Sequence, residues 1–102
     1  MLPIDRVFHA LGDPTRRAMV EYLSAGPLPV TRLAEPFPMS LAAVMQHVRI
    51  LEASGLLKTE KTGRVRTCRV EPAGFAVVDE WVRRRRANWN TRFDRLEGLL
   101  RE

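Results

Sequence analysis

Cysteine and histidine are scarce in this chain of 102 residues, which contains only Cys68, His9 and His47. A single cysteine cannot form a disulfide within the chain, which is typical of proteins from a reducing compartment. A transition-metal site needs about three or four soft or imidazole ligands within reach of one another. We therefore expect no metal site and no cofactor.

Long apolar runs are also missing. No stretch approaches the roughly 18 consecutive apolar residues that a membrane span needs. The N-terminal segment MLPIDRVFHALGDP lacks a basic start followed by a long apolar stretch, so no signal peptide is expected. The sequence therefore predicts no membrane partner and a cytoplasmic location. It also lacks a glycine-rich phosphate loop and a nucleophile with a plausible base, so we do not expect an enzyme.

Basic residues are plentiful. Lysine and arginine number 17 against 12 acidic residues, which gives a net charge of +5 at pH 7 and a sequence pI near 10.6. Such a balance favours a polyanionic partner, most often nucleic acid. It is equally compatible with a charged surface that only keeps the protein soluble.

Two helices are predicted near the N-terminus. Apolar residues recur at helical spacing over residues 4–11, and Gly12 ends this first helix. The second helix has Asp13 as its N-cap and Pro14 at its first helical position. It ends before the glycine and proline at positions 26–27.

The segments 31–37 and 40–55 predict a helix-turn-helix. The first, TRLAEPF, is a short helix whose length Pro36 limits, because proline has no backbone N–H to donate. Ser40 is the N-cap of the next helix, and Gly55 is its natural end. The apolar stripe of this helix faces the core and consists of Leu41, Val44, Val48 and Leu51.

A hairpin and a long helix complete the chain. Residues 56–70 predict two strands around a turn at residues 61–64. Residues 73–101 contain no proline and predict an amphipathic helix, whose apolar positions are Val78, Val82, Trp89, Phe93, Leu96 and Leu100. The predicted order is therefore four helices, two strands and a helix. This is a mainly α protein with a small β-hairpin, a winged helix-turn-helix in which the hairpin is the wing.

Three stretches, LGDPTRRAMVEYL, LAEPFPMSLAAVMQHVRILEASGLL and GRVRTCRVEP, resemble the ArsR/SmtB family of bacterial winged-helix transcriptional repressors. The ending WVRRRRANWNTRFDRLEGLL is similar to a subgroup with a tryptophan-rich last helix. The resemblance covers nearly the whole chain. It implies a dimeric DNA-binding repressor of a small operon that often includes its own gene. Metal-sensing relatives usually carry cysteines in the third helix, which this chain lacks, so it resembles the subgroup without that motif.

The helix after Ser40 is the predicted recognition helix. A DNA major groove about 12 Å wide admits one helix, and small residues near the helix start permit close approach. Gln46 can pair with adenine, and Arg49 can bind a phosphate or a guanine. His47 can donate to a base or phosphate, or pack against the hairpin. The predicted DNA contacts of this helix are Ser40, Ala42, Ala43, Gln46, His47 and Arg49.

The predicted wing is also basic and carries Lys58, Lys61, Arg64, Arg66 and Arg69. Such a hairpin can follow the DNA backbone or enter the minor groove. Charged residues at an exposed strand edge also protect against aggregation, which is the simpler explanation of the lysines. We expect Arg64 and Arg66, ahead of Lys58, to contact DNA.

The last helix carries more apolar surface than a monomer of this size can cover, and large exposed apolar patches indicate interfaces. We expect this surface and the first helix to pair with a second copy through Phe8, Trp81, Trp89, Phe93, Leu96 and Leu100. A two-fold dimer presents two recognition helices about 34 Å apart, which suits a palindromic operator in double-stranded DNA. Residues 1–102 are thus expected to form one DNA-binding domain, with 73–101 as a dimerisation helix.

Two alternatives to this function remain open. The basic face of the winged helix can dock an acidic protein instead of DNA. The chain can also be a thiol-responsive repressor switched at Cys68, because nearby arginines would stabilise a thiolate. A small buried residue is the commoner role of a free cysteine.

Overall fold

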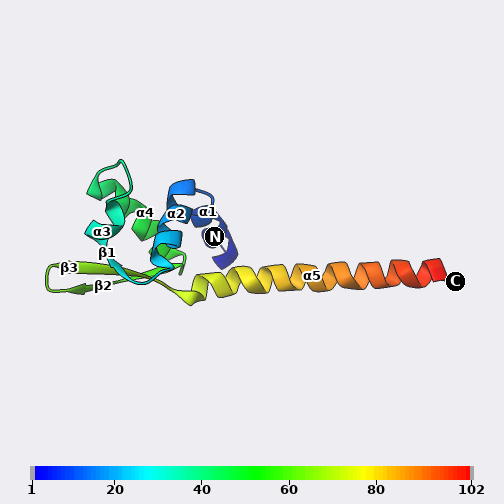
Figure 1. Ribbon diagram of the computed structural model, residues 1–102. Helices are drawn as coiled ribbons and strands as arrows, with labels where there is room; N and C mark the ends of the chain where they lie inside the picture. The colour runs from blue at the N-terminus through cyan, green and yellow to red at the C-terminus, as the bar shows by residue number, and fades with distance from the viewer. Residues whose placement is uncertain (1, 102) are drawn as a thin grey trace.

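The computed structural model describes residues 2–101, which form five helices and three strands. The elements follow in the order α1 (Pro3–Leu11), α2 (Pro14–Leu23), β1 (Leu28–Pro29), α3 (Val30–Ala34), α4 (Leu41–Ala53), β2 (Leu57–Thr62), β3 (Val65–Val70) and α5 (Pro72–Arg101). Helices α1 to α4 and the strands β2 and β3 contribute residues to one core, and α5 extends away from this body (Figure 1). The winged helix-turn-helix that the sequence predicts is confirmed.

Both predicted N-caps are confirmed. The carboxylate of Asp13 accepts hydrogen bonds from the backbone N–H groups of Thr15 at 2.7 Å and Arg16 at 3.2 Å. The hydroxyl oxygen of Ser40 accepts one from the N–H of Ala43 at 3.1 Å. These side chains satisfy donors that a helix start leaves without an internal partner. They fix where α2 and α4 begin.

The predicted third helix is wrong in its extent. The sequence predicts a helix over residues 31–37, whereas α3 ends at Ala34. Pro36 has no N–H with which to continue the helical ladder, and the N–H of Phe37 instead donates to the carbonyl of Ala34 at 3.1 Å. The chain therefore turns early, which lengthens the connection from α3 to α4.

The sheet contains a strand that sequence analysis missed. Its order is β1-β3-β2 with both pairings antiparallel, and Leu28 of β1 lies opposite Cys68 of β3. Two residues, one of them proline, carry too little pattern to predict a strand. The predicted hairpin is therefore part of a three-stranded sheet.

The predicted hairpin turn over residues 61–64 contains the observed turn but is two residues too long. The observed turn lies at Gly63 and Arg64, whereas Lys61 and Thr62, which the prediction also placed in the turn, belong to β2. Gly63 has φ of +61°, a left-handed conformation that glycine adopts without steric cost.

Helix α5 joins the body only through its first turns. Gly74 is the one buried residue of α5, and residues 83–101 are all exposed. At a rise of about 1.5 Å per residue this exposed part is roughly 28 Å long, and the molecule measures 69 × 28 × 25 Å. The predicted helix over 73–101 is confirmed. None of the helices described within residues 2–101 combines the length and the hydropathy that crossing a bilayer requires.

Candidate nucleic-acid interface

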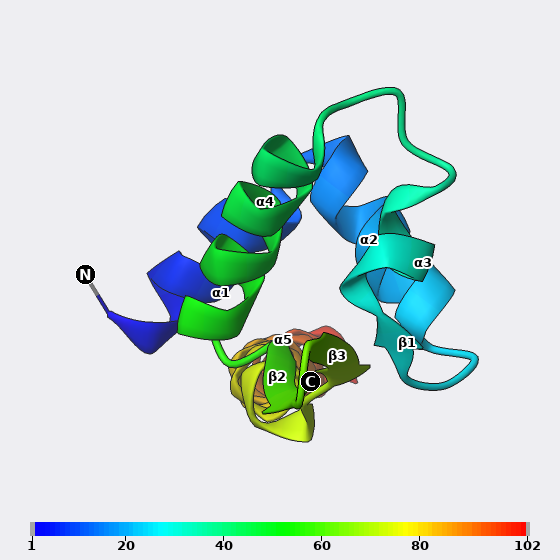
Figure 2. The same cartoon turned by 90° about the vertical axis from the view of Figure 1, so that its left-hand side faces the viewer.

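Helix α4 has one buried face and one exposed face. Val44, Val48 and Leu51 are fully buried, as predicted, whereas Leu41, which was predicted to face the core with them, is 48% exposed in the first turn. The opposite face carries predicted contact residues, of which Ser40, Ala42, Gln46 and Arg49 are exposed and Ala43 and His47 are half-buried. Figure 2 shows α4 beside α1, with the connection from α3 protruding from the body at the start of α4. The start of the helix thus presents small residues together with the exposed Leu41, and an amide and a guanidinium follow further along.

His47 is engaged on one side of its ring. Its Nδ1 lies 3.3 Å from a guanidinium nitrogen of Arg16, a residue of α2 with only 7% of its surface exposed. Sequence analysis did not single out Arg16, because an arginine on a polar helix gives no sign of burial. His47 therefore connects the outer part of α4 to a buried charge.

The two predicted wing arginines differ in their surroundings. Arg64 lies at the hairpin tip and is exposed. Arg66 is half-buried, and its guanidinium donates to the hydroxyl of Thr59 at 3.0 Å. That hydroxyl donates in turn to the carboxylate of Glu52 on α4 at 2.8 Å. Arg64 is thus presented to solvent at the tip, whereas Arg66 links the wing to α4.

The remaining basic residues of the wing are partly paired. Lys58 and Lys61 are exposed, and Arg69 forms ion pairs with Glu60 at 3.4 Å and Glu71 at 4.0 Å. The hairpin tip lies at the opposite end of the molecule from the C-terminus (Figure 1). The free positive charge of the wing is therefore concentrated toward its tip.

Comparisons with known proteins identify the family. Residues 11–60 match the family model of a helix-turn-helix domain. The HTH-type transcriptional regulator Rv2034 of Mycobacterium tuberculosis is 42% identical over 72% of this chain and 69% of its own length. The crystal structure of an ArsR family transcriptional regulator, RHA00566, has a TM-score of 0.82 and 44% identity, covering 86% of this chain and 91% of that one. The chain belongs to the ArsR family of transcriptional regulators.

A further relative belongs to the same class of protein. The transcriptional repressor SdpR of Bacillus subtilis is 30% identical over 60% of this chain and 68% of its own length. This ArsR-family chain is therefore a DNA-binding transcriptional regulator. Within residues 2–101, no group of three or more His, Cys, Asp or Glu side chains is placed to hold a metal ion.

The lone thiol of this ArsR-family chain lies in the core. Cys68 is fully buried on β3. Burial raises the pKa of its thiol and the nearby carboxylate of Glu52 raises it further, while the guanidinium of Arg66 lowers it by less. The arginine effect that favours a thiol switch is present, but the other two outweigh it. At neutral pH the thiol is protonated and shielded, which disfavours the thiol-responsive alternative.

We expect native Cys68 to resist alkylation. Because iodoacetamide reaches a buried thiol only after local opening, the reaction at neutral pH should be on the order of 100-fold slower than for the unfolded chain. Mass spectrometry of timed samples with and without denaturant measures both rates. Labelling of the folded protein at the unfolded rate would restore the thiol switch as a candidate.

A second surface of the molecule is apolar. The six residues predicted to form a dimer interface are all exposed, from 37% for Trp81 to 79% for Leu100. Phe8 and Trp81 meet edge to face with ring centroids 5.5 Å apart, and Trp89 and Phe93 stack at 5.5 Å. The apolar surface of α5 therefore continues onto α1.

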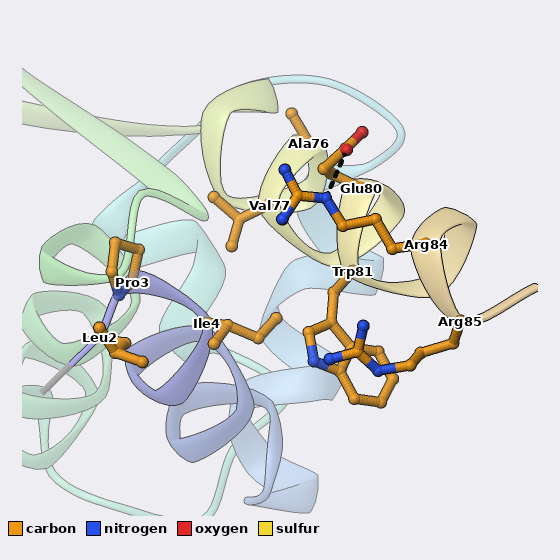
Figure 3. Close-up of a pocket in the computed structure, with 9 residues that line it drawn as sticks. All are labelled: Leu2, Pro3, Ile4, Ala76, Val77, Glu80, Trp81, Arg84 and Arg85. Carbon is orange, nitrogen blue, oxygen red and sulfur yellow. Dashed lines mark hydrogen bonds and ion pairs between the residues drawn. The ribbon is translucent and has the colours of Figure 1, made fainter. Parts of the chain in front are cut away.

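A cavity of about 520 Å³ lies where α1 meets α5. Its walls come from residues 2–4 and from the stretch 76–85, and they are mainly apolar. Figure 3 shows the guanidinium of Arg85 over the ring of Trp81, 4.7 Å from its centroid, and the ion pair of Arg84 with Glu80 at 2.9 Å. The cavity is continuous with the apolar surface through Trp81.

Proposed function

We propose that this protein is a homodimeric repressor that binds a palindromic operator, including one upstream of its own gene. The observation that carries the proposal is the exposed polar face of α4, which is followed in the chain by a wing whose tip exposes Arg64. Occupation of a site that overlaps a promoter excludes the polymerase. The naming of the relative SdpR as a repressor supports repression rather than activation.

The α4 residues divide into three roles. Ser40, Ala42 and Ala43 keep the start of the helix narrow enough to enter the major groove, and an alanine methyl can contact a thymine methyl. Gln46 reads a base edge, because its amide can pair bidentately with adenine. Arg49 binds a phosphate or a guanine and His47 donates a hydrogen bond. Arg64, with Arg66 behind it, contacts the backbone or minor groove from the wing.

The dimer is needed to explain the last helix. None of residues 83–101 is buried within the chain, although they include the apolar side chains of Trp89, Phe93, Leu96 and Leu100. A helix with an apolar stripe of this kind is stable in water only when the stripe is covered. A second copy, paired through α1 and α5 in a two-fold arrangement, covers it on both chains at once.

A mobility-shift assay with the DNA upstream of the protein's own gene tests the repressor. We expect a tight shift with this duplex and a much weaker one with a scrambled duplex of equal length and composition. Gln46→Ala should weaken binding to the upstream duplex by about 1–3 kcal/mol and leave binding to the scrambled duplex unchanged. Equal, weak binding of both duplexes would favour the docking of an acidic protein instead.

Removing the charge at the wing tip should weaken binding to every DNA sequence alike. We expect Arg64→Ala to lower the slope of log K against log salt by about one unit for each wing that contacts a phosphate. Fluorescence anisotropy over a salt series measures the slope. Arg95→Ala removes the same charge from the distal part of α5 and serves as the control. An unchanged slope for Arg64→Ala would remove this residue from the interface.

A further inference from the structure

Arg16 is the one charged residue in the core of the described chain, and every nitrogen of its guanidinium has a partner. The Nε atom donates to the carbonyl of Ala10 at 2.7 Å, and Nη2 donates to the carbonyl of His9 at 3.0 Å. The third nitrogen, Nη1, lies 3.3 Å from Nδ1 of His47 and 3.7 Å from the carboxylate of Asp13. A single planar group thus contacts three elements.

Each of these contacts fixes a different part of the body. The carbonyls of His9 and Ala10 belong to the last turn of α1, where a positive charge is favourable, and the His9 carbonyl also accepts from the N–H of Gly12 at 3.2 Å. Asp13 is the N-cap of α2. His47 lies in the middle of α4, next to Gln46. Because the guanidinium is rigid and its donors diverge at fixed angles, it sets the position of α4 relative to the α1–α2 corner.

The contact also fixes the proton on His47. A guanidinium can only donate hydrogen bonds, so Nδ1 of His47 must accept one and carries no proton. The proton of the neutral ring is then on Nε2. Within residues 2–101 Nε2 has no hydrogen-bond partner, and no side-chain nitrogen or oxygen is both buried and unpartnered, so Nε2 reaches solvent. His47 thus retains an N–H donor that is open to solvent.

We propose that Arg16 is a positioning residue for DNA recognition, which holds α4 in register through His47 and fixes the His47 tautomer that donates from Nε2. The proposal rests on α4 being the recognition helix. Arg16 itself does not touch DNA. Without its guanidinium, α4 is free to shift against the α1–α2 corner, and His47 exchanges between tautomers. Base readout suffers more than phosphate contact, because base pairing of side chains tolerates less displacement.

The first experiment needs no DNA. A long-range ¹H–¹⁵N correlation spectrum of the wild-type protein reports which nitrogen of His47 carries the proton. We expect an unprotonated Nδ1 and a protonated Nε2, and Arg16→Met should give a mixture of the two tautomers. A protonated Nδ1 in the wild-type protein would overturn the proposal whatever the protein binds.

The second experiment compares specificity ratios. The dissociation constants for the upstream duplex and for the scrambled duplex are measured by anisotropy for wild type, Arg16→Met, Arg16→Lys and Arg17→Met. Arg17 is the matched control, because it is exposed and its guanidinium donates to the carbonyl of Leu11 at 2.6 Å rather than to a residue of α4. We expect the ratio to fall about tenfold in Arg16→Met, by less in Arg16→Lys, and to stay within about twofold in Arg17→Met.

The ratio of the two dissociation constants distinguishes a positioning role of Arg16 from a general loss of protein stability. Partial unfolding lowers the active fraction equally for both duplexes and leaves the ratio unchanged. If wild type discriminates between the duplexes and both Arg16 variants discriminate as well as it does, the positioning role is wrong while the repressor stands. If wild type itself does not discriminate, the repressor fails, and the tautomer spectrum still decides the Arg16–His47 contact.

Discussion

Phe93→Glu is expected to convert the proposed dimer into monomers and to weaken operator binding by about 10²–10⁴-fold. The phenyl ring is 57% exposed on α5 and stacks on Trp89, so it belongs to the apolar surface that the predicted interface would cover. A carboxylate there is either left unpaired in an apolar contact or keeps the two copies apart. A monomer loses the gain that comes from binding two linked half-sites. Sedimentation velocity and anisotropy measure the two effects.

The matched control carries the same charge on the other side of the helix. Thr91 lies two residues earlier, which is about 200° around α5, and its hydroxyl donates only to the carbonyl of Ala87 within the helix. We expect Thr91→Glu to remain dimeric and to bind the operator as wild type does. Monomers from both variants would indicate that charge alone splits the dimer. A Phe93→Glu dimer of wild-type strength would exclude the α5 stripe from the interface.

The parts of the fold that could be predicted are those set by residues close together in the sequence. Asp13, Pro14 and Ser40 act on backbone groups within one turn of themselves, and each helix begins where these residues predict. The extent of α5 could be predicted because no proline interrupts its helical pattern of apolar residues. Strand β1 could not be predicted, because its two residues are held by pairing with Cys68 and Thr67, nearly 40 positions later in the chain. Such long-range pairing leaves no local pattern.

The candidate site likewise combines features that the local sequence predicts with one that depends on how the helices pack. The exposed face of α4 follows from helical periodicity once the buried stripe is known, and the structure places Gln46 and Arg49 there. The two wing arginines were predicted as equivalent contacts. Strand alternation puts Arg66 on the same face as Cys68, which is buried, so the inward direction of Arg66 was already implied by the sequence. The burial of Arg16 was not implied by the sequence, because it depends on how α1, α2 and α4 pack against one another.

Gly74→Ala is expected to destabilise the protein by about 1–3 kcal/mol, the range for overpacking a close contact. Gly74 lies in the first turn of α5, and its N–H donates to the carbonyl of Gly55 at 2.8 Å. A Cβ at this position would lie 2.8 Å from the carbonyl carbon and oxygen of Gly55, both backbone atoms, and 3.0 Å from Leu56. Gly55 has φ of +77°, which restricts its own adjustment.

Gly98→Ala provides the opposite result in the same helix. A Cβ there meets no atom within 4 Å, so alanine only lowers the entropy of the unfolded chain and should stabilise by about 0.5–1 kcal/mol. Urea unfolding followed by circular dichroism measures both changes. Equal midpoints for Gly74→Ala and wild type would show that the Gly55–Gly74 approach relaxes without cost.

Because Gly55 follows the end of α4 and Gly74 lies near the start of α5, this contact fixes the angle between the proposed DNA-reading helix and the proposed dimerisation helix. A folded Gly74→Ala variant should therefore dimerise normally but prefer an altered spacing between operator half-sites, since the half-site distance depends on that angle.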